Sequence, residues 1–287
     1  MSEQLFFQNY LVAFLDLVGQ REALRKMSGL PTAPAEIDAF IQIARESLGK
    51  VLDMRKAFAA FFNAAKQEKL DVSQIPAEHR ATFQAARKIT CSMYGLSDAI
   101  VISVPLGGND EDYKATKGIK VALLAVCSLA VLAFGSKIAF RGGVDVGIAT
   151  TLDGGEVYGP ALARAYSLES EMAEYPRFVV GGELLRFLEI VIHQQPTTTF
   201  GALAQKNAAR CKSMVVQDTD GRQMLDFLGR EVRESPGASL LSDMVMPGHD
   251  FVLNEYENFQ RSGNDKLASR YLRLLQYYDA RKKLWGV

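Results

Sequence analysis

The sequence has few of the residues that build disulfide frameworks and zinc sites. Its 287 residues include only three cysteines and three histidines. Cys91, Cys127 and Cys211 are scattered, odd in number and without a C-x-x-C spacing. This pattern argues against a disulfide framework or a zinc site and is typical of a reducing cytoplasm. No histidine lies in a recognisable partnering context, so we expect no Ser-His nucleophile.

An excess of charge of either sign is also missing. Lysine plus arginine and aspartate plus glutamate number 33 each, so the formal net charge is zero. No overall field favours nucleic acid or an anionic membrane as a partner, and any phosphate-binding site must be local. With 48% hydrophobic and 23% charged residues, the composition is that of a soluble globular protein with one large domain or two small ones.

The sequence lacks an apolar run long enough to span a bilayer. The longest, VALLAVCSLAVLAF from Val121 to Phe134, has about 14 residues, whereas a spanning helix needs roughly 20. We expect a helix buried against a sheet. The N-terminus, MSEQLFFQNY, has no basic run ahead of an apolar core, so it does not predict a signal peptide, and we expect a cytoplasmic protein.

The order of the predicted elements is typical of an α+β fold with helices over a mixed sheet. Thr32 is the predicted N-cap of a long helix in which Ile37, Ile41, Ala44, Leu48 and Val51 recur at helical spacing. From about residue 184 the pattern is harder to read, apart from a final helix with Leu267, Tyr271, Leu274 and Tyr278 on one stripe. Strands are predicted over 12–20, 137–151 and 176–182, a hairpin over 88–105, helices over 21–27, 32–62, 121–134 and 160–175, and a surface excursion over 63–88.

Two aspartates interrupt apolar strands. Asp16 lies in VAFLDLVGQ, and Asp98 lies in the hairpin turn of GLSDAIVISV. An ionised carboxylate taken out of water costs several kcal/mol unless it is paired, hydrogen-bonded or bound to a metal. One explanation is that Asp16 ends its strand and caps the next segment. The other is that both carboxylates converge at one end of the sheet and hold divalent metal, while Val18 and Gly19 present backbone N–H groups to a polyphosphate.

Four segments occur in an order that resembles a known family. They are AFLDLVGQ, GLSDAI, FRGGVDVG and GGEVYGPALARAYSLESEMAEYPRFVV. Together they resemble the class III nucleotidyl cyclases and, more closely, the bacterial pyrimidine cyclases of the Pycsar anti-phage defence system. The resemblance covers roughly residues 10–182. It implies a ferredoxin-like mixed sheet covered by helices, with a catalytic domain over 8–184 and a mainly helical C-terminal extension over 185–287 packed on it.

The resemblance also implies a reaction and its cofactors. The 3′-hydroxyl of a nucleoside triphosphate attacks its own α-phosphate and expels pyrophosphate, at active sites on the interface of a homodimer. Asp16, Asp98 and the carbonyl of Leu17 are the implied ligands of two divalent cations, Mg²⁺ or Mn²⁺. The cyclic product acts as a second messenger for a separate effector protein.

Base selection is expected to involve Tyr94, Glu156 and Tyr158. In adenylate cyclases the positions of Tyr94 and Glu156 carry a lysine and an aspartate, which together recognise adenine. A ring at Tyr94 fills space, which favours a pyrimidine over a purine, and Tyr158 is expected to line the same pocket. Glu156 can accept a hydrogen bond from either pyrimidine, and UTP is favoured over CTP because nothing clearly demands the cytosine amino group. The alternative for Tyr94 is an ordinary aromatic residue on a hairpin.

Adenylate cyclases carry an asparagine and an arginine that stabilise the transition state, and this sequence differs from them at both positions. These positions are Ala163 and Ser167 here. Arg164 and Arg177 are candidate replacements, because guanidinium groups match phosphate oxygens in pairs.

Two alternatives stay open at this point. Arg177 can instead form a salt bridge to Glu169 or Glu171, and Arg141 is expected to be structural. The missing transition-state groups also leave open a degenerate cyclase-fold module that binds a nucleotide or a partner without turnover. Retention of both metal-site acids favours the enzyme.

Overall fold

The chain has an α+β fold with a mixed, open, eight-stranded sheet and helices that include several at the C-terminus. The predicted α+β class, the mixed sheet and the C-terminal helices are therefore confirmed. The helix predicted over 21–27 lies outside the described residues. The computed structural model describes residues 6–19, 29, 31–67, 77, 80, 83–84, 88–107, 112–152 and 155–287.

The sheet is built around β1, which pairs antiparallel with β3 on one side and with β4 on the other. β2 and β3 form the predicted hairpin, and β6 adds to β4 in parallel. The strand order is β2-β3-β1-β4-β6-β8-β7, with β5 paired to β4. The strands are β1 (Gln8–Leu17), β2 (Ser92–Leu96), β3 (Ala99–Pro105), β4 (Phe140–Thr151), β5 (Val157–Tyr158), β6 (Phe178–Val180), β7 (Val215–Gln217) and β8 (Gln223–Leu225).

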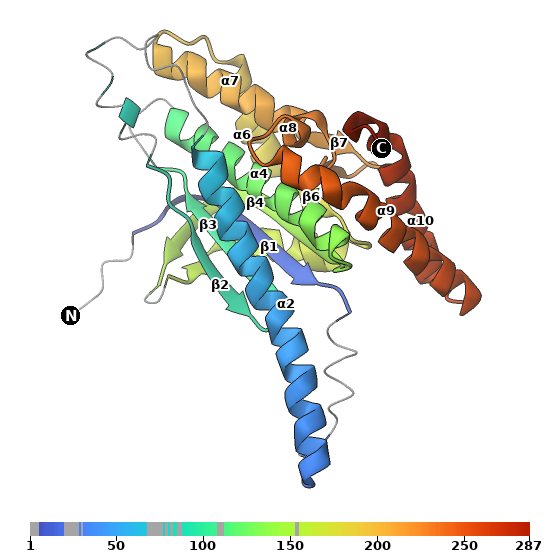
Figure 1. Ribbon diagram of the computed structural model, residues 1–287. Helices are drawn as coiled ribbons and strands as arrows, with labels where there is room; N and C mark the ends of the chain where they lie inside the picture. The colour runs from blue at the N-terminus through green and yellow to red at the C-terminus, as the bar shows by residue number, and fades with distance from the viewer. Residues whose placement is uncertain are drawn as a thin grey trace, which may run out of the picture.

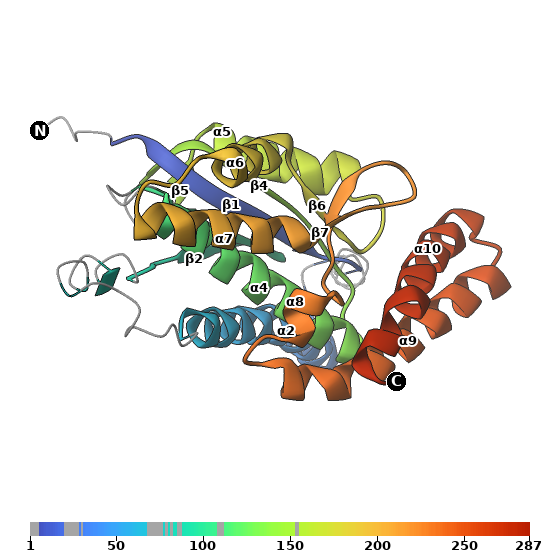
Figure 2. The same cartoon turned by 90° about the horizontal axis from the view of Figure 1, so that it is seen from above.

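Helices cover both faces of this sheet. Figure 2 shows α4 and α5 on opposite sides of β1. α2, α7 and α9 pack on α4, and α10 packs on α9. The helices are α2 (Pro34–Lys66), α4 (Tyr113–Gly135), α5 (Pro160–Ser167), the π-helix η3 (Leu168–Met172), α6 (Gly182–His193), α7 (Thr199–Ser213), α8 (Arg230–Arg233), α9 (Ala238–Arg261), α10 (Asp265–Arg281) and the 3₁₀-helix η4 (Lys282–Trp285).

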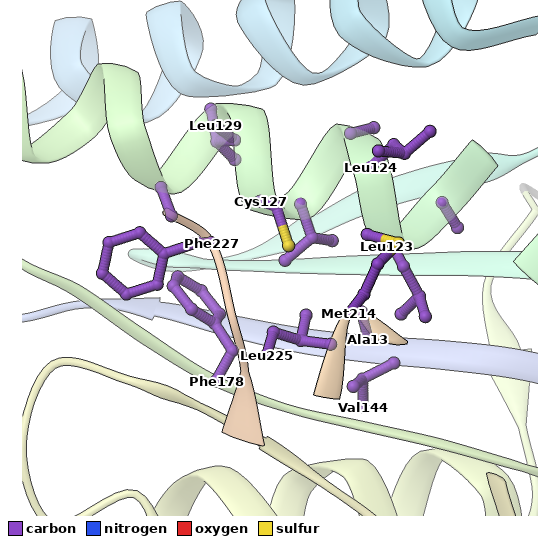
Figure 3. Close-up of a cluster of buried hydrophobic side chains, with 14 of the residues drawn as sticks. Ala13, Leu123, Leu124, Cys127, Leu129, Val144, Phe178, Met214, Leu225 and Phe227 are labelled. Atoms are coloured by element: carbon purple, nitrogen blue, oxygen red, sulfur yellow. The ribbon is translucent and has the colours of Figure 1, made fainter. Parts of the chain in front are cut away.

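The apolar run at Val121 to Phe134 is the central helix of the core, as predicted. It lies in α4, whose 23 residues make it long and apolar enough to cross a membrane by length and composition. However, 89% of its most apolar window is buried inside the protein. Leu123 and Cys127 of α4 face Val144 and Phe178 of the sheet (Figure 3). The burial of α4 therefore accounts for its hydropathy.

Alternation along β1 divides its side chains between two cores. Leu11, Ala13, Leu15 and Leu17 join the large core around α4, while Tyr10, Val12 and Phe14 join a smaller core under α5. Because successive side chains of a strand point to opposite faces, Asp16 belongs to the face of the sheet that α5 covers.

The long helix α2 begins one residue later than predicted. Its N-cap is Ala33, not Thr32, because Pro34 occupies the first helical turn, where its fixed φ is favourable. The Glu36 carboxylate accepts hydrogen bonds from the backbone N–H groups of Thr32 and Ala33, at 2.9 and 3.1 Å. The C-terminal half of α2 packs on the core, and the N-terminal half projects from the body (Figure 1).

The surface excursion predicted over 63–88 is correct for residues 77, 80, 84 and 88, which are exposed, but wrong at two places. Residues 63–66 continue α2, and Phe83 is fully buried. The Phe83 ring stacks on Tyr113, with 5.6 Å between centroids, and lies 6.4 Å from the ring of Phe200. Aromatic packing from distant parts of the chain explains this burial.

The region after residue 184 shares the sheet with the region before it. β8 pairs with β6, and β7 pairs with β8. Phe227 follows β8 and contacts the rings of Phe134 in α4 and Tyr277 in α10, with centroids 5.4 and 4.8 Å away. On α10, Tyr271, Leu274 and Tyr278 of the predicted stripe are buried. The division at residue 184 stays a prediction.

Candidate functional site

Asp16 and Asp98 lie at the same end of two neighbouring strands. Asp16 is opposite Ala99 in the β1–β3 ladder, and Asp98 directly precedes Ala99 in the hairpin turn. Ser97 in this turn has a φ of 58°, the left-handed geometry that two-residue hairpin loops favour. Neighbouring strands are about 5 Å apart, so the backbones of both aspartates are close enough to share a ligand.

Arg141 is the cation beside Asp16. It lies directly opposite Asp16 in the β1–β4 ladder, and its Nη2 is 3.5 Å from Asp16 Oδ2. Its Nε is 2.7 Å from Oε1 of Glu169, whose side chain is buried. β1 continues through Leu17, so Asp16 does not end the strand. Sequence reasoning treated Arg141 as structural and missed this contact, which only the β1–β4 register reveals.

A π-helix positions Glu169 against Arg141. η3 follows α5 without a break and carries Glu169 near its start. π-Helical turns are rare and are frequent at functional sites. The close approach is possible because Gly143 lacks a side chain: a Cβ there would lie 2.3 Å from the Ala165 carbonyl oxygen and 2.8 Å from the Glu169 backbone nitrogen. The FRGG segment therefore supplies both Arg141 and, through Gly143, the space that Glu169 needs to reach it.

The chemistry of Asp16 and Asp98 fits a divalent cation. Both side chains are half-buried, and carboxylate oxygens are ligands that Mg²⁺ and Mn²⁺ accept. Within the described ranges, no group of three or more His, Cys, Asp and Glu side chains is placed to hold a metal. Further ligands would therefore come from the Leu17 carbonyl, water or substrate, and Mg²⁺ is commonly held by one or two carboxylates plus phosphates.

The turn after Asp16 has fewer backbone N–H groups available for a ligand than predicted. The N–H of Val18 donates to the carbonyl of Ala139 at 2.9 Å, so it is already used within the chain. Gly19 has a φ of 95°, and a Cβ added to it would meet nothing within 4 Å, so it marks an open left-handed turn. Of the two predicted substrate contacts in this turn, only Gly19 stays compatible with that role.

Of the three residues predicted to select the base, the structure brings Tyr94 and Glu156 together but does not place Tyr158 beside them. Tyr94 lies opposite Val101 in the ladder, and its hydroxyl donates to the Val157 carbonyl at 3.3 Å. Burial, with a further contribution from the charge of Glu156, raises the pKa of Tyr94. Glu156 and Tyr158 are exposed, and Tyr158 lies opposite Thr150, on the other face of its strand from Val157. Tyr94 and Glu156, predicted from separate segments, are thus neighbours, whereas Tyr158 is turned away from them.

Arg164 joins α5 to β4 by hydrogen bonds and does not face Asp16 or Asp98. Its Nε donates to Asp145 Oδ2 at 3.0 Å, and its Nη2 donates to the Val146 carbonyl at 2.6 Å. Asp145 also accepts from the N–H of Leu184 at 2.8 Å, and burial raises the pKa of Asp145. Asp145 is four residues from Arg141 along β4, which is about 13 Å. The predicted transition-state role of Arg164 gains no support from this position.

Arg177 forms a salt bridge, with partners other than Glu169 or Glu171. Its guanidinium is fully buried and pairs with Asp218 and with Asp220, the latter at 2.6 Å. It also lies over the Tyr175 ring, 4.7 Å from the centroid. These contacts raise the pKa of Arg177 and leave the guanidinium enclosed by protein. Its two acids lie between β7 and β8, in the part of the sequence that was hardest to read.

Ala163 and Ser167 both lie on α5, as predicted, and Ala163 is exposed. Neither can donate a guanidinium or an amide to a phosphate. Among the described residues, Arg141 is therefore the cation that the structure places beside Asp16.

Comparison with protein-family models and with curated proteins found no match to this chain.

Proposed function

We propose that this protein is a metal-dependent nucleotidyl cyclase of the class III type, similar to the Pycsar pyrimidine cyclases. It converts UTP, in preference to CTP, to the 3′,5′-cyclic monophosphate and pyrophosphate. The observation that carries the proposal is the position of Asp16 and Asp98 at the same end of two paired strands. The cyclic product is a cytoplasmic second messenger for a separate effector in anti-phage defence.

In this mechanism the chain positions a triphosphate at the end of β1. Asp16, Asp98 and the Leu17 carbonyl would hold two divalent cations, which would draw charge from the phosphates and favour release of the 3′-hydroxyl proton to solvent. The O3′–Pα bond forms as the bond from Pα to the pyrophosphate oxygen breaks. Arg141, 3.5 Å from Asp16, offers a guanidinium to the phosphate charge. Glu169 orients that guanidinium from its other side.

Base recognition is assigned to Tyr94 and Glu156. The hydrogen bond from Tyr94 to the Val157 carbonyl fixes the ring next to the segment that carries Glu156. A ring held in this way takes up space that a purine would need. Glu156 accepts a hydrogen bond from the edge of the pyrimidine.

We propose a homodimer in which the partner completes each site. The aromatic ring of Tyr166 on α5 is 51% exposed on this side of the sheet. The Tyr166 ring packs edge-on against Phe14, 5.2 Å between centroids, which is two residues from Asp16. Aromatic residues are enriched in the cores of protein interfaces. This face is where a second copy would shield the nucleotide from water.

The proposal is tested by measuring the cyclic product formed from UTP and Mn²⁺ with matched aspartate variants. We expect Asp16→Ala and Asp98→Ala each to lower turnover by at least about a hundredfold, because each removes a metal ligand. Asp53→Ala is the control, since its carboxylate is 72% exposed on α2, and it should retain full turnover. Unchanged turnover in Asp98→Ala would contradict the proposal.

A second candidate function is a cyclase-fold module that binds a nucleotide without turnover. The observation that favours it is the use of Arg164 and Arg177 in salt bridges within the chain. Calorimetry with UTP and Mn²⁺ distinguishes the two. Binding of UTP with no cyclic product, in protein carrying intact Asp16 and Asp98, would favour the binding module.

A further inference from the structure

The half of α2 that projects from the body (Figure 1) carries a stripe of exposed apolar side chains. Ile37, Ile41 and Leu48 are 40%, 38% and 58% exposed, and Ala44 lies between them on the same side of the helix. Contiguous exposed apolar surface on a soluble protein marks an interaction site. Nothing in the active-site proposal uses this stripe.

The spacing of the stripe is that of a coiled-coil seam. From Ile37 to Val51 the apolar positions alternate between four and three residues apart, as in a heptad repeat. After Arg55 the same seam continues through Phe58, Phe62 and Ala65, which are buried in the core. One half of the seam therefore packs inside its own chain, and the other half is presented outward.

We propose that the projecting half of α2 packs antiparallel against the same segment of a second copy of this chain. A two-fold axis between residues 42 and 43 places Ile37 against the partner's Leu48 and Ile41 against the partner's Ala44. Each bulky side chain then meets a position of the opposite class in the seam, as antiparallel knobs-into-holes packing requires. The antiparallel direction also keeps the two bodies at opposite ends of the paired helices.

Charge complementarity favours this partner and this direction. Asp38 and Arg45 flank the seam on the same side, and both are exposed. They are seven residues apart, about 10 Å along the helix, which is too far for a pair within one helix. In the antiparallel arrangement, Asp38 of one copy lies within about 3 Å, along the axis, of the partner's Arg45. The two-fold axis repeats this pair.

This contact is separate from the active-site dimer proposed above and does not rest on it. α2 lies on the α4 side of the sheet, whereas the active-site face is the one that α5 covers (Figure 2). Two different two-fold contacts on one chain build a closed tetramer or an open filament. If only the α2 contact exists, the particle is a dimer.

The first test compares particle mass in two leucine variants by light scattering. Leu48→Glu places a charge in the seam, and we expect it to lower the mass at least twofold relative to the wild type at the same concentration. Leu240→Glu is the matched control, because Leu240 on α9 is also 58% exposed, and it should leave the mass unchanged. An unchanged mass in Leu48→Glu, or an equal loss in both variants, would overturn the proposal.

Charge exchange tests the pairing of Asp38 with the partner's Arg45. Each of Asp38→Arg and Arg45→Asp alone should raise the dissociation constant of the α2 contact roughly five- to tenfold, because like charges then face each other twice. The double variant restores opposite charges and should recover the wild-type value. Additive weakening in the double variant would show that these residues do not pair.

Disulfide trapping tests the antiparallel direction. The double variant Ile37→Cys/Leu48→Cys should form an intermolecular disulfide under mild oxidation, since the two positions meet across the contact. The single variants should not, because each thiol is then about 16 Å from its equivalent in the partner. Cross-linking in the single variants would indicate parallel helices and overturn the proposal. The cyclase assay on Leu48→Glu tests the enzyme proposal separately.

Discussion

At the scale of single residues, Asp16 shows how a buried strand accommodates an acid. Its carboxylate is 24% exposed, at the end of β1, and lies 3.5 Å from the guanidinium of Arg141. Arg141 is in turn held by Glu169. Partial exposure and the neighbouring guanidinium both lower the desolvation cost of an ionised carboxylate at this position.

The sequence indicated which arginines to examine but not their partners. Arg164 pairs with Asp145, 19 residues away, and Arg177 pairs with Asp218 and Asp220, more than 40 residues away. Nearby glutamates were the expected partners of Arg177 because sequence reasoning sees only short separations. Strand pairing decides these contacts, and the three-residue strands β7 and β8 gave no recognisable pattern.

Asp220 makes the stability of the protein depend on pH. The hydrogen bond from Arg177 holds the pKa of Asp220 below its usual value. A depressed carboxyl pKa contributes stability above the unfolded pKa of about 4, and that contribution is lost as the pH falls through the folded pKa. We expect Asp220→Asn to lower the free energy of unfolding at pH 7 by about 1–3 kcal/mol.

Chemical denaturation at several pH values measures this effect. The difference between Asp220→Asn and the wild type should shrink below about pH 4, where the wild-type carboxyl also becomes neutral. Asp243→Asn, at an exposed position of α9, is the control and should match the wild type throughout. A difference that does not change with pH would show that Asp220 acts through packing alone.

At the scale of elements, the segments with strong local patterns were predicted correctly. The β2–β3 hairpin, β4, α5 and α4 all occur where alternation, turn residues or an apolar run indicated them. β1 begins at Gln8, earlier than predicted, because its pairing with β4 extends to Ala149. Such boundaries depend on the neighbouring strand, which local propensity does not report.

Gly143 sets the distance between β4 and α5. A Cβ at this position would lie 2.3 Å from the Ala165 carbonyl oxygen and 2.5 Å from Leu168 Cβ. Both belong to packed elements, so we expect Gly143→Ala to destabilise the protein by about 1–3 kcal/mol through overpacking. The same shift moves Glu169 away from Arg141, so turnover should fall as well.

Thermal unfolding of two glycine variants checks this prediction. Gly182→Ala is the control, because a Cβ at Gly182 has nothing within 4 Å and the position opens α6. It should leave the melting temperature unchanged or slightly higher. Equal melting temperatures for Gly143→Ala and Gly182→Ala would show that β4 and α5 can separate without cost.

At the scale of the whole molecule, the C-terminal region shares the large core with α4 and the sheet. Phe134, Phe178, Phe227 and Tyr278 come from α4, β6, the segment after β8, and α10, and they belong to the same buried cluster. Trp285 near the C-terminus is buried, and its Nε1 donates to the Leu228 carbonyl at 2.9 Å. The C-terminal region is thus joined to the sheet by packing and by hydrogen bonds.

This architecture predicts cooperative unfolding of the two regions. Trp285 is the only tryptophan in the sequence, so its fluorescence reports undocking of the C-terminal region, while far-UV circular dichroism reports all helices. We expect coincident transitions. Phe227→Ala should lower both midpoints together, by the equivalent of about 3–5 kcal/mol, and Leu240→Ala should change neither. Two separated midpoints would show that the C-terminal region unfolds independently.

The central claim is that the paired aspartates at the end of β1 serve a pyrimidine nucleotide cyclase. The most direct measurement is a competition reaction in which the purified protein, with Mn²⁺, receives equimolar ATP, GTP, CTP and UTP. Products are separated by chromatography and identified by mass, with Asp98→Ala as the parallel control. The account predicts cyclic UMP as the main product and none from the variant. A cyclic purine as the main product, or no cyclic nucleotide at all, would contradict it.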